Sequence, residues 1–462
     1  MSENQDFQSQ LVAFVHDTRF EDLPPELVTR TQRHIVDTLG AGLVGASSEV
    51  AKDVSTILLA EGAAPVAALW GRGEKTSARN AALLNGIACH ALELDDTGGC
   101  DHSGAVVIPA LLAVLPFCPQ PVSGKAFITA VVLGYDIARR VLEACGGYSA
   151  HNGAGWHSTS TCGVLGAAAA AGRLLGLDKA QISSALGIAG SFSGGLWAFI
   201  HDGSQSKKLH AGRAAEGGVL AALSAQAGIT GPAGLFEDHW GGFLKTLSAK
   251  TAQPSALVAD LGQVWKLMRC SIKPYASCRG THSAIDATGI LLDRLEGAVD
   301  EIEQVKVTLS PFLQEMCGDE QISTLAAAQM SIRYAVAARL VYGHAGLDAY
   351  GDEQRRCPAL LEAIGRVVLE VDPAYSADGE PQVTLVTKNG ISLTHRVDIA
   401  LGAPTHPMSD AQLRDKFMSL ATRSISSLQA ETLWEQTLAL EDVMDMRVIE
   451  QLLELSSSAP FI

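Results

Sequence analysis

Hydrophobic residues in roughly the first 250 positions recur every three or four residues, which is the period of amphipathic helices. Leu27, Ile35 and Leu39 follow Pro25, and proline is favoured at the first position of a helix. Further apolar stretches, rich in alanine and glycine, lie at 127–142, 163–175 and 214–227. Because small side chains let helix axes approach closely, these stretches predict one dense helical domain.

Two segments on either side of a polar turn extend this pattern. Leu84, Ile87 and Leu94 form a stripe that predicts a helix ending at the acidic residues 95 and 96. The run from 103 to 115 is apolar on all sides, which predicts a buried helix with His102 near its N-terminus. Pro109 lies inside this run and should bend or break the helix.

After about position 265 the pattern becomes that of a mixed α and β region. Val305, Val307 and Leu309 alternate with polar residues, as in a half-buried strand. A hairpin is predicted at 383–395, because its two alternating runs flank Asn389-Gly390, a pair that suits a type I′ turn. A further strand is predicted at 366–371, and helices are predicted at 281–295 and 326–342.

The end of the chain returns to a helical pattern. Ser409 and Gln412 have the spacing of a capping box, which predicts the start of a final helical segment that packs back on the helical domain. The predicted fold is therefore mainly α. A large all-helical domain (1–264 and 405–462) carries a smaller α+β lid domain (265–404), inserted before the C-terminal helices.

Composition and charge narrow the classes of function. Of the 462 residues, 47% are hydrophobic and 18% are charged, as in ordinary globular proteins. The net charge of −16 argues against nucleic-acid binding, although a local group of cations can still attract an anionic substrate. The apolar stretches are too short or too interrupted for a membrane span, and the nine scattered cysteines predict reduced thiols. We therefore expect a cytoplasmic protein.

Two patterns that suggest cofactors have simpler interpretations. The sequence GAGLVG at 40–45 matches the dinucleotide-binding pattern GxGxxG, which requires a strand before it. The preceding residues have helical periodicity instead, so we predict a helix–helix contact. Cys89, Cys100 and Cys118 lack the close spacing of iron–sulfur ligands, so no metal is predicted.

Residues able to transfer protons or bind anions fall into three groups. The groups are Asp95, Asp96, Thr97, Asp101 and His102; Lys207, Lys208 and His210; and Lys273, Cys278, Arg279 and His282. A carboxylate beside a histidine supports proton transfer, and grouped lysine and arginine side chains hold carboxylates or phosphates. Taken singly, such a group is more typical of a capped helix end or a solvated helix face. If the groups converge, they predict an enzyme that acts on a small polyanion by acid–base chemistry.

Five motifs in order along nearly the whole chain resemble the MmgE/PrpD family. They are HALELDDT at 90–97, the following His102, GWHST at 155–159, KKLHAGRAA at 207–215 and KPYASCRGTHSAIDA at 273–287. This family includes 2-methylcitrate dehydratase, cis-aconitate decarboxylase and iminodisuccinate epimerase. The resemblance implies a helical domain with a smaller α+β lid, a cleft between them and a homodimer. It implies no metal or organic cofactor.

The resemblance also implies a set of cleft residues. Matched by motif, these are Glu93, Thr97, His102, Lys207, Lys273, Cys278 and Tyr334. Glu93 and Cys278 differ from the decarboxylases of the family, which have aspartate and histidine there. The loop at 98–103 also differs from the commoner family form, which ends in His-Pro. These differences leave the identity of the substrate open.

Each group receives an expected role. We expect His102 to be the acid or base, with Asp96 orienting it. Substrate carboxylates are expected to be held by Lys207, Lys273 and Arg279, with Lys208 and His282 beside them. The candidates for a second proton-transfer group are Tyr334, Tyr148 and His157.

The predicted activity is that of a dehydratase-type lyase that removes a proton next to a carboxylate of a small di- or tricarboxylate. Return of that proton to the opposite face would instead make the protein an epimerase of a dicarboxylate such as iminodisuccinate. Loss of carbon dioxide would make it a decarboxylase of a cis-aconitate-like acid. A non-catalytic carboxylate-binding protein is the alternative from a different class.

Overall fold

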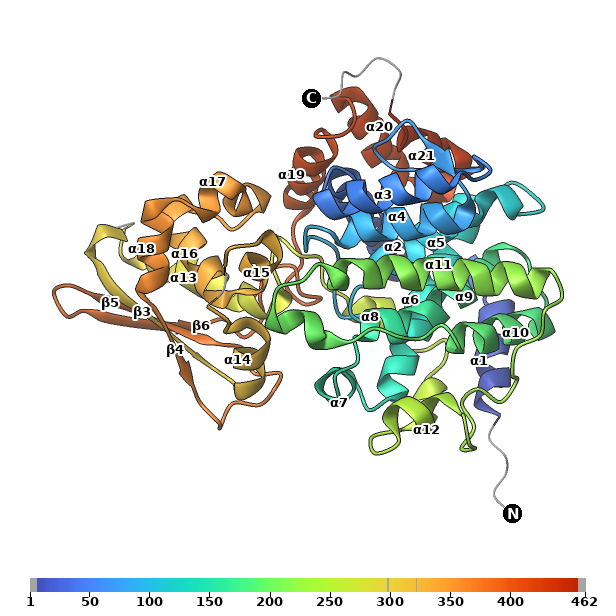
Figure 1. The fold of residues 1–462 in the computed structure, drawn as a ribbon, viewed down its shortest axis with the longest axis horizontal. Helices are drawn as coiled ribbons and strands as arrows, with labels where there is room; N and C mark the ends of the chain where they lie inside the picture. The colour runs from blue at the N-terminus through green and yellow to red at the C-terminus, as the bar shows by residue number, and fades with distance from the viewer. Residues whose placement is uncertain (1–5, 297–298, 321, 456–462) are drawn as a thin grey trace.

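The computed structural model describes residues 6–296, 299–320 and 322–455 of the chain. They form a large helical body and a smaller body that contains a four-stranded sheet (Figure 1). The predicted fold class, mainly α with a small α+β part, is confirmed. Within the described residues, no helix is both long enough and apolar enough to cross a membrane.

The helical body is built from the first half of the chain and from its end. Its helices are α1 (Phe7–Asp17), α2 (Pro25–Gly45), α3 (Glu49–Glu61), α4 (Ala78–His90), α5 (Gly104–Val114), α6 (Gly124–Ala144), α7 (Tyr148–Gly153), α8 (Ser158–Thr161), α9 (Gly163–Leu174), α10 (Lys179–Gly190), α11 (Ser206–Gln226), α12 (Phe243–Ser248), α19 (Asp410–Ala421), α20 (Ser427–Leu438) and α21 (Arg447–Leu452). A two-stranded ribbon joins β1 (Ala67–Ala68) to β2 (Lys75–Thr76). Every residue of α5 is buried, so this helix forms the centre of the core.

Glycines bring the helix backbones of this body close together. A Cβ atom built on Gly86 of α4 would lie 2.8 Å from the Cα of Gly212 of α11. A Cβ on Gly45 would lie 1.8 Å from the carbonyl oxygen of Ala88, so α2 and α4 also meet at a glycine. The GxGxxG pattern therefore lies inside α2 and makes helix contacts, as the sequence predicts.

A predicted helix end and a predicted helix break next to the polar turn were wrong, and a third predicted helix, elsewhere in the chain, is divided. Helix α4 ends at His90 and not at the acidic pair 95 and 96, because the chain leaves the helix in a tight turn. Pro109 does not break α5, which runs from Gly104 to Val114 with the proline inside it. The predicted helix 326–342 is divided at Ser331, whose hydroxyl caps the second half.

The α+β body has its sheet in the strand order β4-β3-β5-β6. The strands are β3 (Ile302–Leu309), β4 (Val367–Val371), β5 (Gln382–Thr387) and β6 (Ser392–Arg396), and its helices are α13 (His282–Arg294), α14 (Pro311–Cys317), α15 (Leu325–Met330), α16 (Ile332–Tyr342), α17 (Asp352–Arg355) and α18 (Pro358–Gly365). β3 pairs in parallel with β4 and antiparallel with β5. Apolar residues of α13 and α16 form a common core with the inward-facing residues of β3 and β5.

The predicted hairpin is confirmed, but its turn type is not. Leu385 of β5 pairs with Leu393 of β6. A type I′ turn needs positive φ at both central residues, whereas here Gly390 has φ of +84° and Asn389 is not in that region. Four residues separate the strands, and the hydroxyl of Thr387 donates to the Asn389 side chain at 2.5 Å, which favours a wider turn.

The last helices return to the helical body, at the right of Figure 1. Ser409 caps α19 together with Gln412, so the predicted capping box is confirmed. α19 and α20 both pack against α2, and Phe417 and Leu433 belong to the core of the helical body. The domain boundaries at 264/265 and 404/405 remain a prediction.

We expect the Gly212→Ala substitution to lower the free energy of unfolding by about 1–3 kcal/mol, the usual cost of overpacking. The added methyl carbon would lie 2.2 Å from the carbonyl oxygen of Leu83, a backbone atom that cannot rotate away. Gly365→Ala is the matched control, because no atom lies within 4 Å of its added carbon. Urea unfolding measures both, and equal stability of the two variants would contradict the close α4–α11 contact.

Candidate functional site

A cleft of about 790 Å³ separates the two bodies and is lined by residues of both. From the helical body it is lined by Thr97, His102, Tyr148 and Lys207, and from the α+β body by Cys278 and Arg279. Members of all three polar groups recognised in the sequence therefore face one space. The apolar side chains of Trp197, Phe312 and Met316 complete part of the wall.

The turn after α4 orients the polar residues of the helical wall. Glu93 and Asp101 have φ of +55° and +107°, a region that residues with a side chain seldom adopt. Such backbone strain is common at functional sites. Two backbone hydrogen bonds between Thr97 and Ser271, of 3.0 and 2.8 Å, fix the turn to the segment that precedes Lys273.

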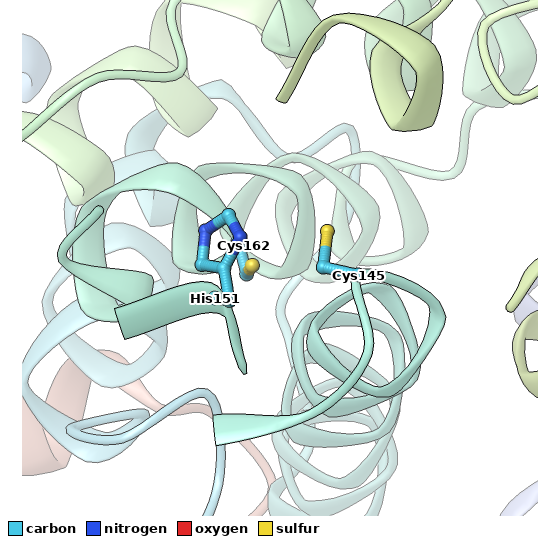
Figure 2. Close-up of side chains that lie close together, drawn as sticks. All are labelled: Cys145, His151 and Cys162. Carbon is cyan, nitrogen blue, oxygen red and sulfur yellow. The ribbon is translucent and has the colours of Figure 1, made fainter. Parts of the chain in front are cut away.

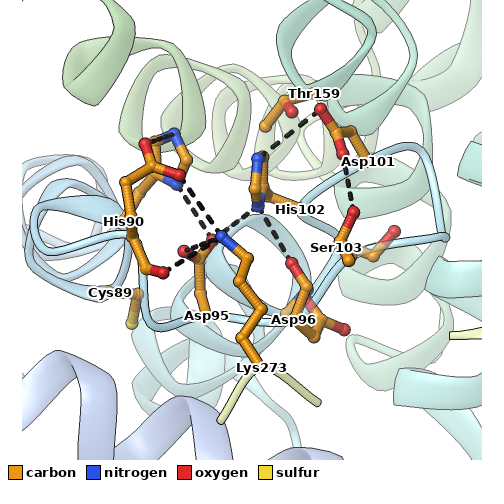
Figure 3. A network of polar contacts seen from close by, with 12 residues as sticks. Cys89, His90, Asp95, Asp96, Asp101, His102, Ser103, Thr159 and Lys273 are labelled. Atoms are coloured by element: carbon orange, nitrogen blue, oxygen red, sulfur yellow. Dashed lines mark hydrogen bonds and ion pairs between the residues drawn. The ribbon is translucent and has the colours of Figure 1, made fainter. Parts of the chain in front are cut away.

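His102 lies between carboxylates (Figure 3). Its Nδ1 is 2.9 Å from the backbone carbonyl oxygen of Asp96 and 3.1 Å from Oδ2 of Asp95, whereas its Nε2 is 3.5 Å from Oδ2 of Asp101. Burial alone would lower the pKa of His102, but Asp101 and Asp95 raise it above the ordinary value. The imidazole is therefore held in a state that favours the protonated form. Nδ1 thus has two close partners, whereas the contact of Nε2 with Asp101 is longer.

Asp96 contacts His102 through its backbone carbonyl oxygen, whereas its carboxylate binds other partners. Its Oδ2 accepts a hydrogen bond from the Tyr135 hydroxyl at 2.7 Å and lies 3.2 Å from Nδ1 of His34. Its Oδ1 accepts from the backbone N–H of Gly104 at 2.9 Å, which places the carboxylate at the N-terminus of α5. Of the two adjacent carboxylates, that of Asp95 is the one that contacts His102.

Asp95 also binds a second histidine. Its Oδ2 is 2.9 Å from Nδ1 of His90, so two imidazoles share one carboxylate oxygen. Burial alone would raise the pKa of Asp95, but His90, His102 and Lys273 hold it well below the ordinary value. Burial lowers the pKa of His90 to about 3, so this ring is neutral and donates its Nδ1–H to Asp95. His90 therefore supports the carboxylate, whereas the raised pKa of His102 favours its protonated form.

Glu93 is surrounded by three lysines. Its Oε1 accepts from Lys207 at 2.6 Å and from Lys208 at 2.5 Å, and its Oε2 accepts from Lys273 at 3.3 Å. Burial opposes the charged form of all three lysines; it lowers the pKa of Lys208 to about 8, whereas Glu93 keeps those of Lys207 and Lys273 raised. Only Lys207 of the three also lines the cleft. The structure thus places Lys208 and Lys273 against a protein carboxylate, not against the open part of the cleft.

The opposite wall carries a thiol and a guanidinium group. A hydrogen bond with Cys317 lowers the pKa of Cys278 to about 6, and the charge of Lys207 acts in the same direction. Arg279 forms an ion pair with Glu380 at 2.7 Å. This wall therefore offers a thiolate near neutral pH beside a cation.

Of the three residues predicted as the second proton-transfer group, one lines the cleft and two do not. Tyr148 lines the cleft, and burial raises its pKa, so its phenol stays protonated. His157 lies behind Asp101: its Nε2 is 3.9 Å from Oδ2 of Asp101 and its Nδ1 is 2.8 Å from Nδ1 of His210. Tyr334 is fully buried and donates to the carbonyl oxygen of Ala349 at 2.7 Å, so its predicted role was wrong.

His282 was also wrongly assigned to the substrate. Its Nε2 is 3.2 Å from the carbonyl oxygen of Ser277, and its ring packs edge-on against Tyr275 inside the α+β body. The residue begins α13, and the start of that helix faces the core. The sequence suggested a ligand-binding role because a polar residue stands at a helix start. The burial of His282 contradicts that role.

Sequence reasoning missed several residues of the site. Asp95 and Asp101 were noticed in the acidic group, but the sequence does not show which carboxylates face His102. The connection between β4 and β5 was missed entirely, although Asp378 and Glu380 line the cleft. The Ser149 hydroxyl donates to Oδ1 of Asp378 at 3.1 Å, which links the two walls. Nothing in that polar connection distinguishes it from an ordinary loop.

Two sets of buried donors at the site could hold a cation. They are His90, Asp95 and His102, and Asp101, His102 and His157, each with donor atoms within 4.8 Å of one another. Both sets include His102, so a cation in either would take a nitrogen of that ring away from proton transfer.

Comparison with known proteins supports a common family for both bodies. Residues 9–255 match the MmgE/PrpD N-terminal domain, and residues 275–442 match the MmgE/PrpD C-terminal domain. The cis-aconitate decarboxylase-like protein oryM of Aspergillus oryzae is 29% identical, and the match covers 95% of each chain. The cis-aconitate decarboxylase of Homo sapiens is 28% identical over 96% of this chain and 95% of its own. That of Aspergillus terreus is 26% identical over 98% and 97%.

We expect the Glu93→Gln substitution to lower the free energy of unfolding by about 3–5 kcal/mol, the usual cost of leaving buried charges without their partner. Burial alone would raise the pKa of Glu93, but Lys207, Lys208 and Lys273 hold it well below 4.5. Its stabilising effect is therefore present above pH 4.5 and is lost as the pH falls through the folded-state value.

The measurement is urea unfolding of both proteins at pH 7 and at lower pH. Glu303→Gln, on an exposed position of β3, is the control and should change stability little. A Glu93→Gln protein as stable as the control variant would show that this carboxylate does not hold the three lysines.

Proposed function

The chain belongs to the MmgE/PrpD family, and from this premise we propose that it is a lyase of small di- or tricarboxylates that needs no cofactor. One observation carries the proposal: His102 is flanked by two carboxylates and faces the same cleft as Lys207 and Arg279. A protonated imidazole beside fixed cations suits a reaction that leaves negative charge next to a carboxylate and then needs a proton.

The cations of the cleft define the class of substrate. Lys207 and Arg279 line opposite walls, and Arg139 and Arg269 also reach the cleft. Arg139 and Arg269 share one carboxylate, that of Glu143, at 2.9 and 3.0 Å. Two cations on one anion leave positive charge for a ligand. Guanidinium groups bind carboxylates in paired hydrogen bonds, so a substrate with two or three carboxylates fits this arrangement.

Decarboxylation is the first candidate reaction, because the relatives named above are cis-aconitate decarboxylases or similar to them. The bond between a substrate carbon and its carboxylate breaks, carbon dioxide leaves, and the electron pair stays on the carbon. Lys207 and Arg279 stabilise this charge through the remaining carboxylates. Nε2–H of His102 then donates its proton to the carbon, and water restores the imidazolium.

Dehydration is the second candidate, and Cys278 is the observation that favours it. With a pKa of about 6, this thiol is largely ionised at neutral pH and can remove a proton next to a carboxylate. The hydroxyl on the neighbouring carbon leaves as water after it takes a proton from His102 or Tyr148. Return of a proton from His102 to the first carbon would instead give epimerisation with the same residues.

Incubation with citrate-like, aconitate-like and aspartate-derived acids in deuterated water, followed by NMR, tests these reactions together. We expect release of carbon dioxide and incorporation of one deuterium from an aconitate-like acid. Cys278→Ser should retain decarboxylation, which needs no base, but should lose dehydration or epimerisation by about a hundredfold or more. No reaction with any acid would contradict the proposal and favour a carboxylate-binding protein.

We expect the His102→Gln substitution to lower kcat by about a hundredfold or more, the usual contribution of general acid–base catalysis, while substrate still binds. For the unsubstituted protein, kcat/KM should fall as the pH rises through the pKa of His102, which lies above 6.5, because the proton donor is then lost. Steady-state kinetics across pH measure both effects, and calorimetry measures binding.

Tyr334→Phe is the control for this substitution, because its hydroxyl binds the carbonyl oxygen of Ala349 away from the cleft. Its kcat should equal that of the unsubstituted protein. If His102→Gln keeps full turnover, or if activity rises through the same pH range, His102 is not the proton donor.

A further inference from the structure

Two cysteines and one histidine meet at a second buried place, next to the cleft but not part of its lining (Figure 2). Cys145 follows the C-terminal end of α6, His151 lies in α7, and Cys162 directly precedes α9. All three side chains are buried, and their donor atoms lie within 4.8 Å of one another. The reaction proposed above uses none of them.

Cys145 differs from the other buried cysteines of the helical body, whereas burial raises the pKa of Cys162 as it does theirs. Burial raises the pKa of Cys100 to about 12, as is usual for an inert thiol. At Cys145, hydrogen bonds with Cys162, His151 and Ser248 lower the pKa to about 5. Burial and the hydrogen bond with Cys145 raise the pKa of Cys162 instead.

The hydrogen bonds of His151 leave one ring nitrogen directed at this cluster. The Thr161 hydroxyl donates to the carbonyl oxygen of His157 at 3.3 Å, so it accepts the Nε2–H of His151 at 2.7 Å. Nδ1 then carries a lone pair, and it lies 3.2 Å from the hydroxyl of Ser248. Metal-binding histidines characteristically donate their other N–H to such an outer partner.

We propose that Cys145, Cys162 and Nδ1 of His151 bind one Zn²⁺ ion, with the Ser248 hydroxyl next to the fourth position. Two thiolates and an imidazole are ligands that Zn²⁺ prefers, and it takes four ligands in a tetrahedron. Binding forms two Zn–S bonds and one Zn–N bond and releases the thiol proton of Cys162 to solvent. Two thiolates neutralise the divalent ion, which suits a fully buried place.

The location of this site beside the cleft predicts that a bound ion would stabilise one wall of the cleft. The residues that follow Cys145 are Gly146, Gly147 and Tyr148, which line the cleft. An ion that joins the end of α6, α7 and the start of α9 would fix this wall. The inference does not depend on the reaction proposed above, and its failure would leave that reaction untouched.

The test uses the purified full chain, stripped with a chelator and titrated with Zn²⁺ or with Co²⁺ as a spectroscopic probe. We expect one ion per chain, thiolate-to-cobalt charge-transfer absorption in the near ultraviolet, and a Tm that rises with Zn²⁺ but not with Mg²⁺. Cys145→Ser and Cys162→Ser should lose the charge-transfer absorption. Cys357→Ser, at a half-buried thiol outside the cluster, should keep it.

A second variant leaves all three donor residues in place, so its effect on Zn²⁺ binding does not come from the loss of a ligand. Thr161→Val removes the partner of the His151 N–H and should weaken Zn²⁺ binding by about 10–100-fold. The inference is overturned if the unsubstituted chain takes up cobalt without thiolate absorption, or if Cys145→Ser retains that absorption. It is equally overturned if stoichiometric Zn²⁺ leaves the Tm unchanged.

Discussion

The burial of one carboxylate among three ammonium groups is the interaction on which the site depends. Glu93 follows α4, Lys207 and Lys208 lie in the first turn of α11, and Lys273 precedes α13. One side chain therefore ties together two helices of the helical body and the segment that leads into the α+β body. Lys273 also lies 3.9 Å from Asp95, so three ammonium groups face two carboxylates beside the cleft. A local group of cations of this kind can focus the electric field on an anion even where the net charge of the chain is −16.

Helix packing sets the distances within this group. Gly86 lies four residues before the end of α4 and Gly212 lies near the start of α11, and the two backbones meet at these glycines. The C-terminal end of α4 is thereby brought beside the N-terminal end of α11. Small residues in the core thus have a direct consequence for chemistry, because they bring Glu93 within reach of Lys207.

The sequence predicts most of the helices and the hairpin, because these depend on local periodicity and on short motifs. It does not predict which of two adjacent carboxylates faces His102. Asp95 and Asp96 differ by one position in a turn, and the direction of each side chain depends on partners distant in sequence, such as Tyr135. Tyr334 and His282 were misplaced for the same reason, since a residue at a helix start can face a core or a cleft. The roles of the remaining site residues stay predictions.

The connection between β4 and β5 shapes the opening of the cleft independently of the core that supports His102. Asp378 of this connection binds Ser149 across the cleft and Glu380 also lines the cleft, whereas His102 and its carboxylates belong to the helical body. A longer or shorter connection would change the width of the opening and the charge at its edge without altering the core on which the histidine rests. The shape of the cleft can therefore diverge between related chains by insertion or deletion in one surface loop, while the surroundings of His102 remain the same.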